Sequence, residues 1–258
     1  MCPLKKRDGS GPLSDELSEP GGTPPPIINA PDAVKWLIGA IATVHLLRLA
    51  LPDWADYLLV ETLAFDSSAY TDAGTRAAKP LALILGPVGH MLLHRDLLHL
   101  SVNMGLFLSF GAVIGRRMGA GPFVGFFTLS GIAGAATWFL LHPYSPGLLI
   151  GASGGISGMF GALARIGLAR QPMPGGPPPL RGRRIALNFA LVWLCVNFVI
   201  GLLGEQIFGA GHAIAWEAHL GGFAAGFLLI ARFDGCGLVA DTGQPTAQPV
   251  EPGADGRP

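Results

Sequence analysis

The sequence predicts an all-α membrane protein, a bundle of six transmembrane helices with both termini in the cytoplasm. Half of the 258 residues are hydrophobic and only 13% are charged, whereas soluble domains are about a quarter charged. The mean hydropathy is +0.47. The apolar residues gather in six long segments, and basic and acidic residues sort into different loops. This composition excludes an ordinary soluble domain.

The two ends of the chain differ in composition from its middle. Residues 1–33 and 232–258 are rich in Gly, Pro and acidic residues, so we expect two disordered tails around a transmembrane domain of residues 34–231. The first tail has basic residues but no apolar stretch next to them. No cleavable signal peptide is therefore expected.

Six apolar segments are long enough, or nearly so, to cross about 30 Å of hydrocarbon. They cover residues 34–51, 91–115, 122–141, 153–169, 185–204 and 213–231. The fourth is short, because a helix from Ser153 to Arg165 rises only about 18 Å. It should begin below the outer surface. The preceding HPYSPGLLIGA is then expected to dip into the membrane without helical structure, where protein or water satisfies its backbone.

The charges of the loops predict the orientation. Arginines follow the second segment and lie between the fourth and fifth: Arg116, Arg117, Arg170, Arg181, Arg183 and Arg184. The loop of residues 52–89 carries mainly acidic side chains: Asp53, Asp56, Glu61, Asp66 and Asp72 against Arg76 and Lys79. Basic loops stay in the cytoplasm. The second, fourth and sixth segments should therefore begin outside and run inward.

Composition also limits the partners and cofactors. Seventeen basic residues balance 17 acidic ones, so no nucleic-acid partner is indicated. The cysteines Cys2, Cys195 and Cys236 lie too far apart for a disulfide framework or a Cys-based metal site. His90 and His94 have metal-ligand spacing, but the sequence offers no third ligand and no H-E-x-x-H. We expect neither a metal nor a cofactor.

The stretch LLIGASGGISGMFG, residues 148–161, places two serines among glycines. Small residues of this kind allow close packing of membrane helices. The G-A-S-G around Ser153 also has the form of a nucleophile motif, whose small neighbours let a substrate carbonyl approach the hydroxyl. If a helix begins there, its free backbone N–H groups favour a developing oxyanion. Ser157 keeps the packing interpretation.

The sixth segment offers a base for this serine. In AWEAHLGGFAAGF, His219 lies about one and a half turns below the outer end, a depth that matches Ser153. Glu217 falls on roughly the opposite helix face, so no carboxylate is expected beside His219 and a Ser–His dyad results. Close packing of two glycine faces would bring the pair together. These glycines are Gly222 and Gly226 opposite Gly151, Gly154, Gly158 and Gly161.

The second segment carries a polar pair, His99 and Asn103, four residues apart on one helix face. Such a pair is costly in lipid unless it faces the protein interior. Both side chains can donate hydrogen bonds, and with the Ser153 N–H they would form an oxyanion hole. Other polar residues within the segments fit either snorkelling or helix packing and receive no role: His45, Arg48, Asn188 and Asn197.

Taken in order, these motifs resemble the rhomboid family of intramembrane serine proteases. The matches are H-x-x-x-N at His99 and Asn103, G-x-S-G-x-x-x-G from Gly151, and H-x-x-G-x-x-x-G from His219. The resemblance covers residues 34–231. It implies a rhomboid-like six-helix domain with a Ser153 and His219 dyad and an oxyanion held by His99, Asn103 and the Ser153 N–H. It also implies hydrolysis of peptide bonds in or near transmembrane helices of substrate proteins.

Two departures from the family pattern concern anchoring. Many members have a Trp-Arg pair shortly before the second helix, where this chain reads LALILGPVGH, and some stack a Tyr on the catalytic His where this chain has Ser157. His94 matches a position where the family often has a histidine. The expected location is the bacterial inner membrane, in contact with lipid and with the active site open to the periplasm. The sequence leaves the oligomeric state open.

Two other functions compete with proteolysis. A non-catalytic rhomboid-like protein would bind transmembrane helices without cutting them, but such proteins usually lack the Ser or the His. A small transporter would need polar residues that continue to the cytoplasmic side. Below Asn103 the chain reads MGLFLSFGAVIG and below His219 it reads LGGFAAGFLLI, so a polar cavity would open to one side only.

Overall fold

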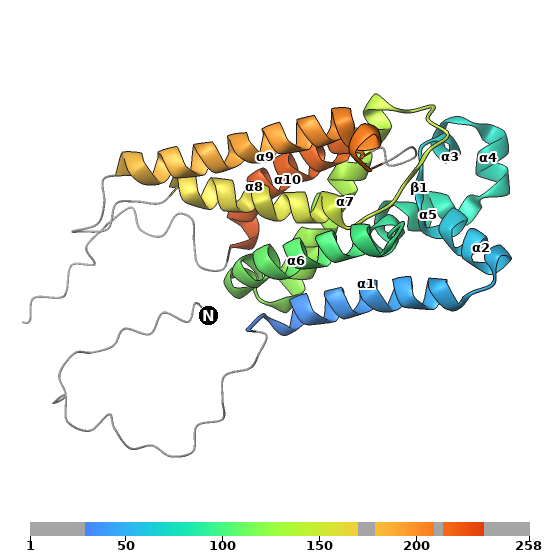
Figure 1. Cartoon of the computed structure of the whole chain (residues 1–258), viewed down its shortest axis with the longest axis horizontal. Coiled ribbons are helices and arrows are strands. Elements are labelled where there is room, and N and C mark those ends of the chain that lie inside the picture. Colours follow the sequence, from blue (N-terminus) through green and yellow to red (C-terminus); the bar gives the residue numbers. More distant parts are fainter. Residues whose placement is uncertain (1–28, 170–178, 209–213, 235–258) are drawn as a thin grey trace, which may run out of the picture.

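The computed structural model describes residues 29–169, 179–208 and 214–234 (Figure 1). In chain order the elements are α1 (Asp32–Ala50), α2 (Asp53–Leu63), β1 (Phe65–Asp66), α3 (Ser68–Thr71), α4 (Ala73–Ala78), α5 (Pro80–Gly89), η1 (His90–Leu92), α6 (Leu97–Met118), α7 (Ala120–Leu141), β2 (Leu148–Leu149), α8 (Ser153–Ala169), α9 (Pro179–Phe208) and α10 (Trp216–Phe233).

Each of the six apolar segments forms a helix: α1, α6, α7, α8, α9 and α10. The expected start of the second segment at residue 91 is wrong, because the 3-10 turn η1 and an extended stretch come first. There Asp96 caps α6, and its Oδ1 accepts the His99 N–H at 2.8 Å. Within the described chain, α1, α6, α7 and residues Arg183–Gly204 of α9 are long and apolar enough to cross a membrane. The shorter α8 and α10 fall outside this group.

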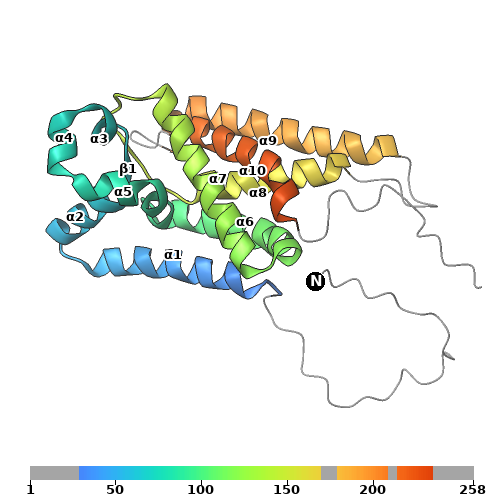
Figure 2. The same ribbon diagram turned by 180° about the vertical axis from the view of Figure 1, so that it is seen from behind.

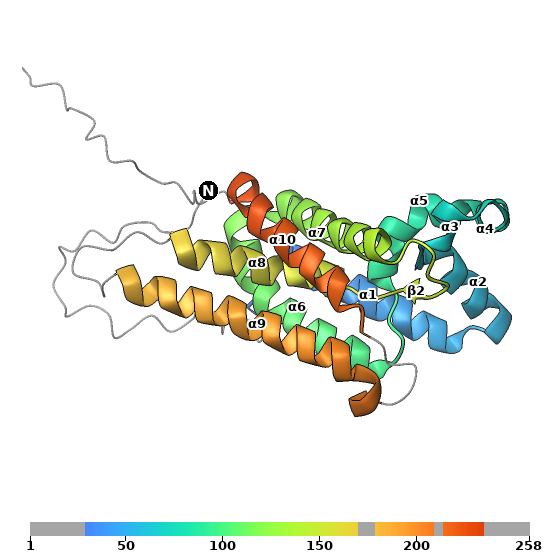
Figure 3. The same cartoon turned by 90° about the horizontal axis from the view of Figure 1, so that it is seen from above.

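The long helices pack into one bundle (Figure 2). In the view from above, α10 lies between α7 and α8, and α9 runs along α8 (Figure 3). On the other side of the bundle, α1 packs against α6. Phe107 of α6 and Phe123 of α7 are fully buried, and their rings meet edge to face at 6.1 Å. Apolar burial thus joins α6 and α7, while α8 and α10 meet through glycine.

The segment of residues 52–89 is more ordered than its sequence predicted. It forms four helices, α2 to α5, which gather at one end of the molecule (Figure 1). All four are too short to stand out as membrane spans, even though α5 is apolar throughout. α5 approaches α2 closely, because a Cβ at Gly89 would lie 2.8 Å from the Leu63 carbonyl oxygen. A larger residue there would push the two helices apart.

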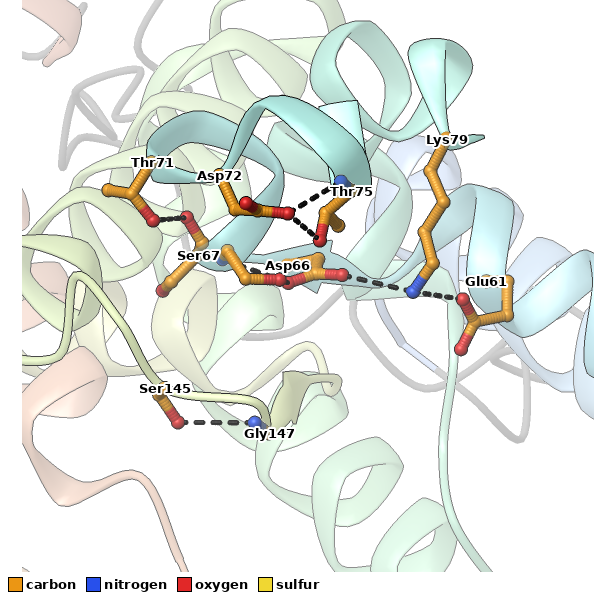
Figure 4. A network of polar contacts seen from close by, with 10 residues as sticks. Glu61, Asp66, Ser67, Thr71, Asp72, Thr75, Lys79, Ser145 and Gly147 are labelled. Carbon is orange, nitrogen blue, oxygen red and sulfur yellow. Dashed lines mark hydrogen bonds and ion pairs between the residues drawn. The ribbon is translucent and has the colours of Figure 1, made fainter. Parts of the chain in front are cut away.

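A polar network holds this segment together (Figure 4). The Lys79 ammonium lies between the carboxylates of Glu61 and Asp66. Asp66 also accepts hydrogen bonds from the Ser68 N–H at 2.9 Å and hydroxyl at 2.6 Å. Burial alone would raise the pKa of Asp66, but the bonds from Ser68 and Lys79 outweigh it and lower the pKa. The hydrogen bond between the Lys79 ammonium and the Glu61 carboxylate raises the pKa of Lys79. These ionic contacts anchor the loop without a Trp-Arg pair.

Residues 52–89 are also joined to the chain that leads into α8. β1 pairs antiparallel with β2, with Phe65 opposite Leu149 and Asp66 opposite Leu148. The Thr71 hydroxyl donates to the Pro143 carbonyl at 2.9 Å. Residues 142–152 are non-helical, as the prolines and glycines predicted, although the sequence did not predict the short strand. Contacts with β1 and α3 therefore fix the chain that approaches Ser153.

Candidate active site

The turn before Ser153 requires glycine. Gly151 has φ +122°, a conformation that only glycine adopts without strain. Its N–H donates to the His90 carbonyl at 2.8 Å. A Cβ at this position would also come within 3.0 Å of the His99 ring. The turn thus lets α8 begin at Ser153. The N–H groups of a first helical turn have no acceptor within the helix and favour negative charge nearby.

Ser153 and His219 lie in hydrogen-bonding contact. The Ser153 Oγ is 2.7 Å from the His219 Nε2. One side chain comes from the first residue of α8 and the other from the first turn of α10, and both are half-buried. With Nε2 unprotonated, the hydroxyl donates to the imidazole. This is the arrangement in which a histidine can remove the proton of a serine nucleophile.

Contact between backbones sets this separation. A Cβ at Gly222 would collide with the carbonyl of Gly154, and one at Gly226 with the carbonyl of Gly158. α7 also approaches closely, because a Cβ at Gly134 would lie 2.7 Å from the Ala218 carbonyl oxygen. The two helices that carry Ser153 and His219 therefore lie as near as their main chains allow.

A third side chain, Asn197 of α9, contacts the histidine from the other side. The Asn197 Oδ1 is 2.6 Å from the His219 Nδ1, and the Asn197 Nδ2 donates to the Trp193 carbonyl at 2.8 Å. The sequence left Asn197 without a role. Its only signal was one amide in the apolar run FALVWLCVNFVIG, which fits helix packing equally well. Glu217 lies away from this ring and contacts the His142 Nε2 at 3.0 Å.

His99 and Asn103 of α6 have different surroundings from each other. The His99 ring lies against Gly151, two residues before Ser153. Asn103 is buried, and its Nδ2 donates to the His99 carbonyl at 2.9 Å. One amide N–H of Asn103 is therefore used within α6, and the second is available to another acceptor. Ser157 is buried in α8.

His90 and His94 do not form a joint ligand set. The His90 Nδ1 lies 3.0 Å from the Gly86 carbonyl oxygen, while His94 is fully buried with its ring 4.9 Å from that of His99. Among the residues that the structure describes, no group of three His, Cys, Asp or Glu side chains could hold a metal ion. Most of the two expected tails, and Arg170, lie outside the described residues. Arg181 belongs to α9, but its side chain is not described.

Two comparisons relate this chain to known proteins. The family model of the rhomboid domain matches residues 84–233, from α5 to the end of α10. The rhomboid protease GluP of Bacillus subtilis (strain 168) is 29% identical over 141 residues, which make up 55% of this chain and 24% of GluP. The chain thus matches about a quarter of that relative's length. Because the family match covers more than half of the chain, this protein belongs to the rhomboid family.

Proposed function

We propose that this protein is an intramembrane serine endopeptidase that hydrolyses peptide bonds in or near the transmembrane helices of other membrane proteins. The observation that carries the proposal is the contact of 2.7 Å between the Ser153 Oγ and the His219 Nε2. Family membership and the similarity to a rhomboid protease support it. No metal or cofactor has a part in the proposed reaction.

The reaction begins when the Ser153 Oγ attacks the scissile carbonyl carbon and its proton passes to the His219 Nε2. The tetrahedral intermediate collapses as the carbon–nitrogen bond breaks, and the leaving amine takes the proton from His219. Water then attacks the acyl-enzyme, with His219 again accepting the proton. The second product carries the new carboxyl group, and Ser153 regains its hydroxyl.

The oxyanion of the intermediate needs donors near Ser153. The Ser153 N–H, at the start of α8, is the first. The His99 side chain beside Gly151 and the second amide N–H of Asn103 are the other two in this proposal. His99 is half-buried and Asn103 is buried, so competition from water is reduced.

We further propose a topology of six membrane spans in residues 34–231, with both termini cytoplasmic and the site open to the outside. The protein belongs to the rhomboid family and has helices long and apolar enough to cross a membrane, so it is an integral membrane protein. The bacterial inner membrane fits the Bacillus relative. The Arg117 guanidinium pairs with Asp234 at 2.7 Å, so the ends of α6 and α10 lie at the same side of the bundle. This agrees with a cytoplasmic arginine-rich face.

The proposal is tested with a fluorophosphonate probe on the detergent-solubilised protein, and the adduct is located by mass spectrometry. We expect wild type to be labelled on Ser153 and to cleave a model transmembrane substrate. Ser153→Ala should lose both properties, while the matched control Ser157→Ala keeps them. Equal cleavage by wild type and Ser153→Ala would reject the assignment. A folded wild type that neither reacts nor cleaves would favour a non-catalytic rhomboid-like protein that binds transmembrane helices.

A further inference from the structure

We propose that Asn197 is a positioning residue for His219, and that α9 must therefore be docked against the bundle for efficient catalysis. This inference rests on the proposed serine protease function. It assigns Asn197 no contact with substrate. Its role is to hold the imidazole in the tautomer and orientation that leave Nε2 ready to accept the Ser153 proton.

The first step of the argument concerns the proton on His219. The Asn197 Oδ1 can only accept a hydrogen bond, and it lies 2.6 Å from the His219 Nδ1. The proton of the neutral ring must then sit on Nδ1, which leaves a lone pair on Nε2. That lone pair faces the Ser153 Oγ. An acceptor at Nδ1 selects the form that can act as a base.

The second step concerns the amide itself. Asn side chains can turn over and exchange donor for acceptor, which would place N–H groups against His219 and favour the wrong tautomer. Here the Nδ2 donates to the Trp193 carbonyl at 2.8 Å. The Trp193 carbonyl oxygen can only accept a hydrogen bond. A reversed amide would therefore place the Asn197 Oδ1 against this oxygen, which is unfavourable. The backbone of α9 thus fixes which end of Asn197 meets the histidine.

The third step concerns the helix that carries Asn197. Of the four spans of sufficient length, the span in α9 is the least buried, since only 11% of its 18-residue apolar stretch lies inside the protein. It is held to its neighbours by aromatic contacts. Trp193 stacks on Phe223 of α10 at 4.6 Å, and Phe189 stacks on Phe160 of α8 at 5.5 Å. If α9 retreats, the acceptor leaves His219, while the contact between α8 and α10 is unaffected.

The experiment compares three variants of the full-length protein in detergent. Asn197→Ala removes the acceptor, and Asn197→Asp retains one. Asn188→Ala is the matched control, because Asn188 is an exposed asparagine nine residues earlier on the same helix and so faces roughly the opposite way. For each variant we measure the melting temperature, kcat and KM on a model transmembrane substrate, and the rate of fluorophosphonate labelling.

The expected loss in Asn197→Ala lies in turnover. We expect kcat and the labelling rate to fall about 10²-fold, the contribution of a well-placed general base, with KM and the melting temperature near wild type. Asn188→Ala should match wild type in all four measurements. Because the fluorophosphonate needs Ser153 and His219 but no substrate helix, its slower reaction separates positioning from substrate docking.

The pH profile gives a readout that a purely structural role would not change. The Asn197→Asp carboxylate should stabilise the protonated imidazole and move the acid limb of the kcat profile up by about one pH unit or more. At pH values above that limb, the kcat of Asn197→Asp should return toward the wild-type value. Other ionisable groups nearby, His99 on α6 and the His142–Glu217 pair, are identical in all variants. Differences between variants therefore report the contact at residue 197.

Two results would overturn the inference. One is a folded Asn197→Ala protein with wild-type kcat and labelling rate. The other is a folded Asn197→Asp protein whose kcat stays about 10²-fold below that of wild type at every pH. This second result does not require the alanine variant to fold. In both cases wild type still reacts at Ser153, so the proposed function stands. If wild type itself is not labelled at Ser153, the proposed function fails and this inference fails with it.

Discussion

Asn103 is a residue whose local bonding strengthens the fold very little. Its side chain is 4% exposed, and its Oδ1 has no hydrogen-bond partner among the protein atoms that the structure describes. A buried unpaired polar atom costs about 1–3 kcal/mol. Its Nδ2 donates only to the carbonyl of the preceding turn. Such a residue fits a role in chemistry better than a role in stability.

The first prediction follows from this imbalance. Asn103→Ala should lower kcat on the order of 10²-fold, because an oxyanion donor acts mainly in the transition state. KM and the melting temperature should change little. Steady-state kinetics on a transmembrane substrate and a thermal melt in the same detergent check it. Slow fluorophosphonate labelling should persist, because Ser153 and His219 remain.

His99→Ala should show the same division between turnover and stability, through the ring that lies against Gly151. The contrary result for Asn103 is a protein that unfolds in mild detergent with no selective loss of turnover. Asn103 would then be a helix-packing residue.

At the scale of elements, the contact between α8 and α10 determines how near Ser153 lies to His219. Four glycines make it: Gly222 and Gly226 on α10 face the carbonyls of Gly154 and Gly158 on α8. A main-chain carbonyl cannot move aside as a side chain can. Any added methyl group must therefore separate the helices.

The second prediction concerns this interface. Gly226→Ala should lower the free energy of unfolding by about 2 kcal/mol or more, since overpacking against backbone has no easy relief. It should also lower kcat, because His219 is carried away with α10. A thermal melt and the cleavage assay measure the two effects. Gly105→Ala on α6 is the control, because its Cβ meets no atom within 4 Å, and alanine there should leave stability unchanged or slightly raised. A Gly226→Ala protein as stable and active as this control would contradict the close contact.

For the whole molecule, charge separates the two ends of the bundle. The end formed by α2 to α5 carries the buried Asp66 and its network (Figure 4). The opposite end carries arginines: Arg116, Arg117, Arg183, Arg184 and Arg232. Positively charged residues remain on the cytoplasmic side during insertion.

The third prediction is the resulting orientation. In a variant without native cysteines, a cysteine at Ala77, which is exposed in α4, should react with a membrane-impermeant maleimide added to whole cells. A cysteine at Met173, between Arg170 and Arg181 in the sequence, should react only after the membrane is opened. Gel-shift labelling distinguishes the two. The reverse pattern would place the proposed site on the cytoplasmic face.

The sequence predicted the parts of the molecule that depend on local pattern. Long apolar runs predicted all six long helices, and the start of α8 at Ser153 was predicted to the residue. The helices α2 to α5 were missed because they are short: α2 to α4 also carry polar residues, and the apolar α5 has only 10 residues and is interrupted by Pro87. Asn197 was missed for another reason. Its contact with His219 joins residues 22 apart on different helices, and no periodicity within either helix encodes it.

The glycine contact has a consequence for how such a protein can diverge. Because carbonyl oxygens set the spacing of α8 and α10, the distance from Ser153 to His219 depends on a few positions where a side chain is absent. Most other side chains on these helices have no part in it. Sequence drift can therefore replace much of the lipid-facing surface, such as the exposed Leu220 and Leu228 of α10, and still preserve the reacting geometry. A chain built this way keeps the geometry of the Ser153–His219 pair while its overall identity to its relatives falls.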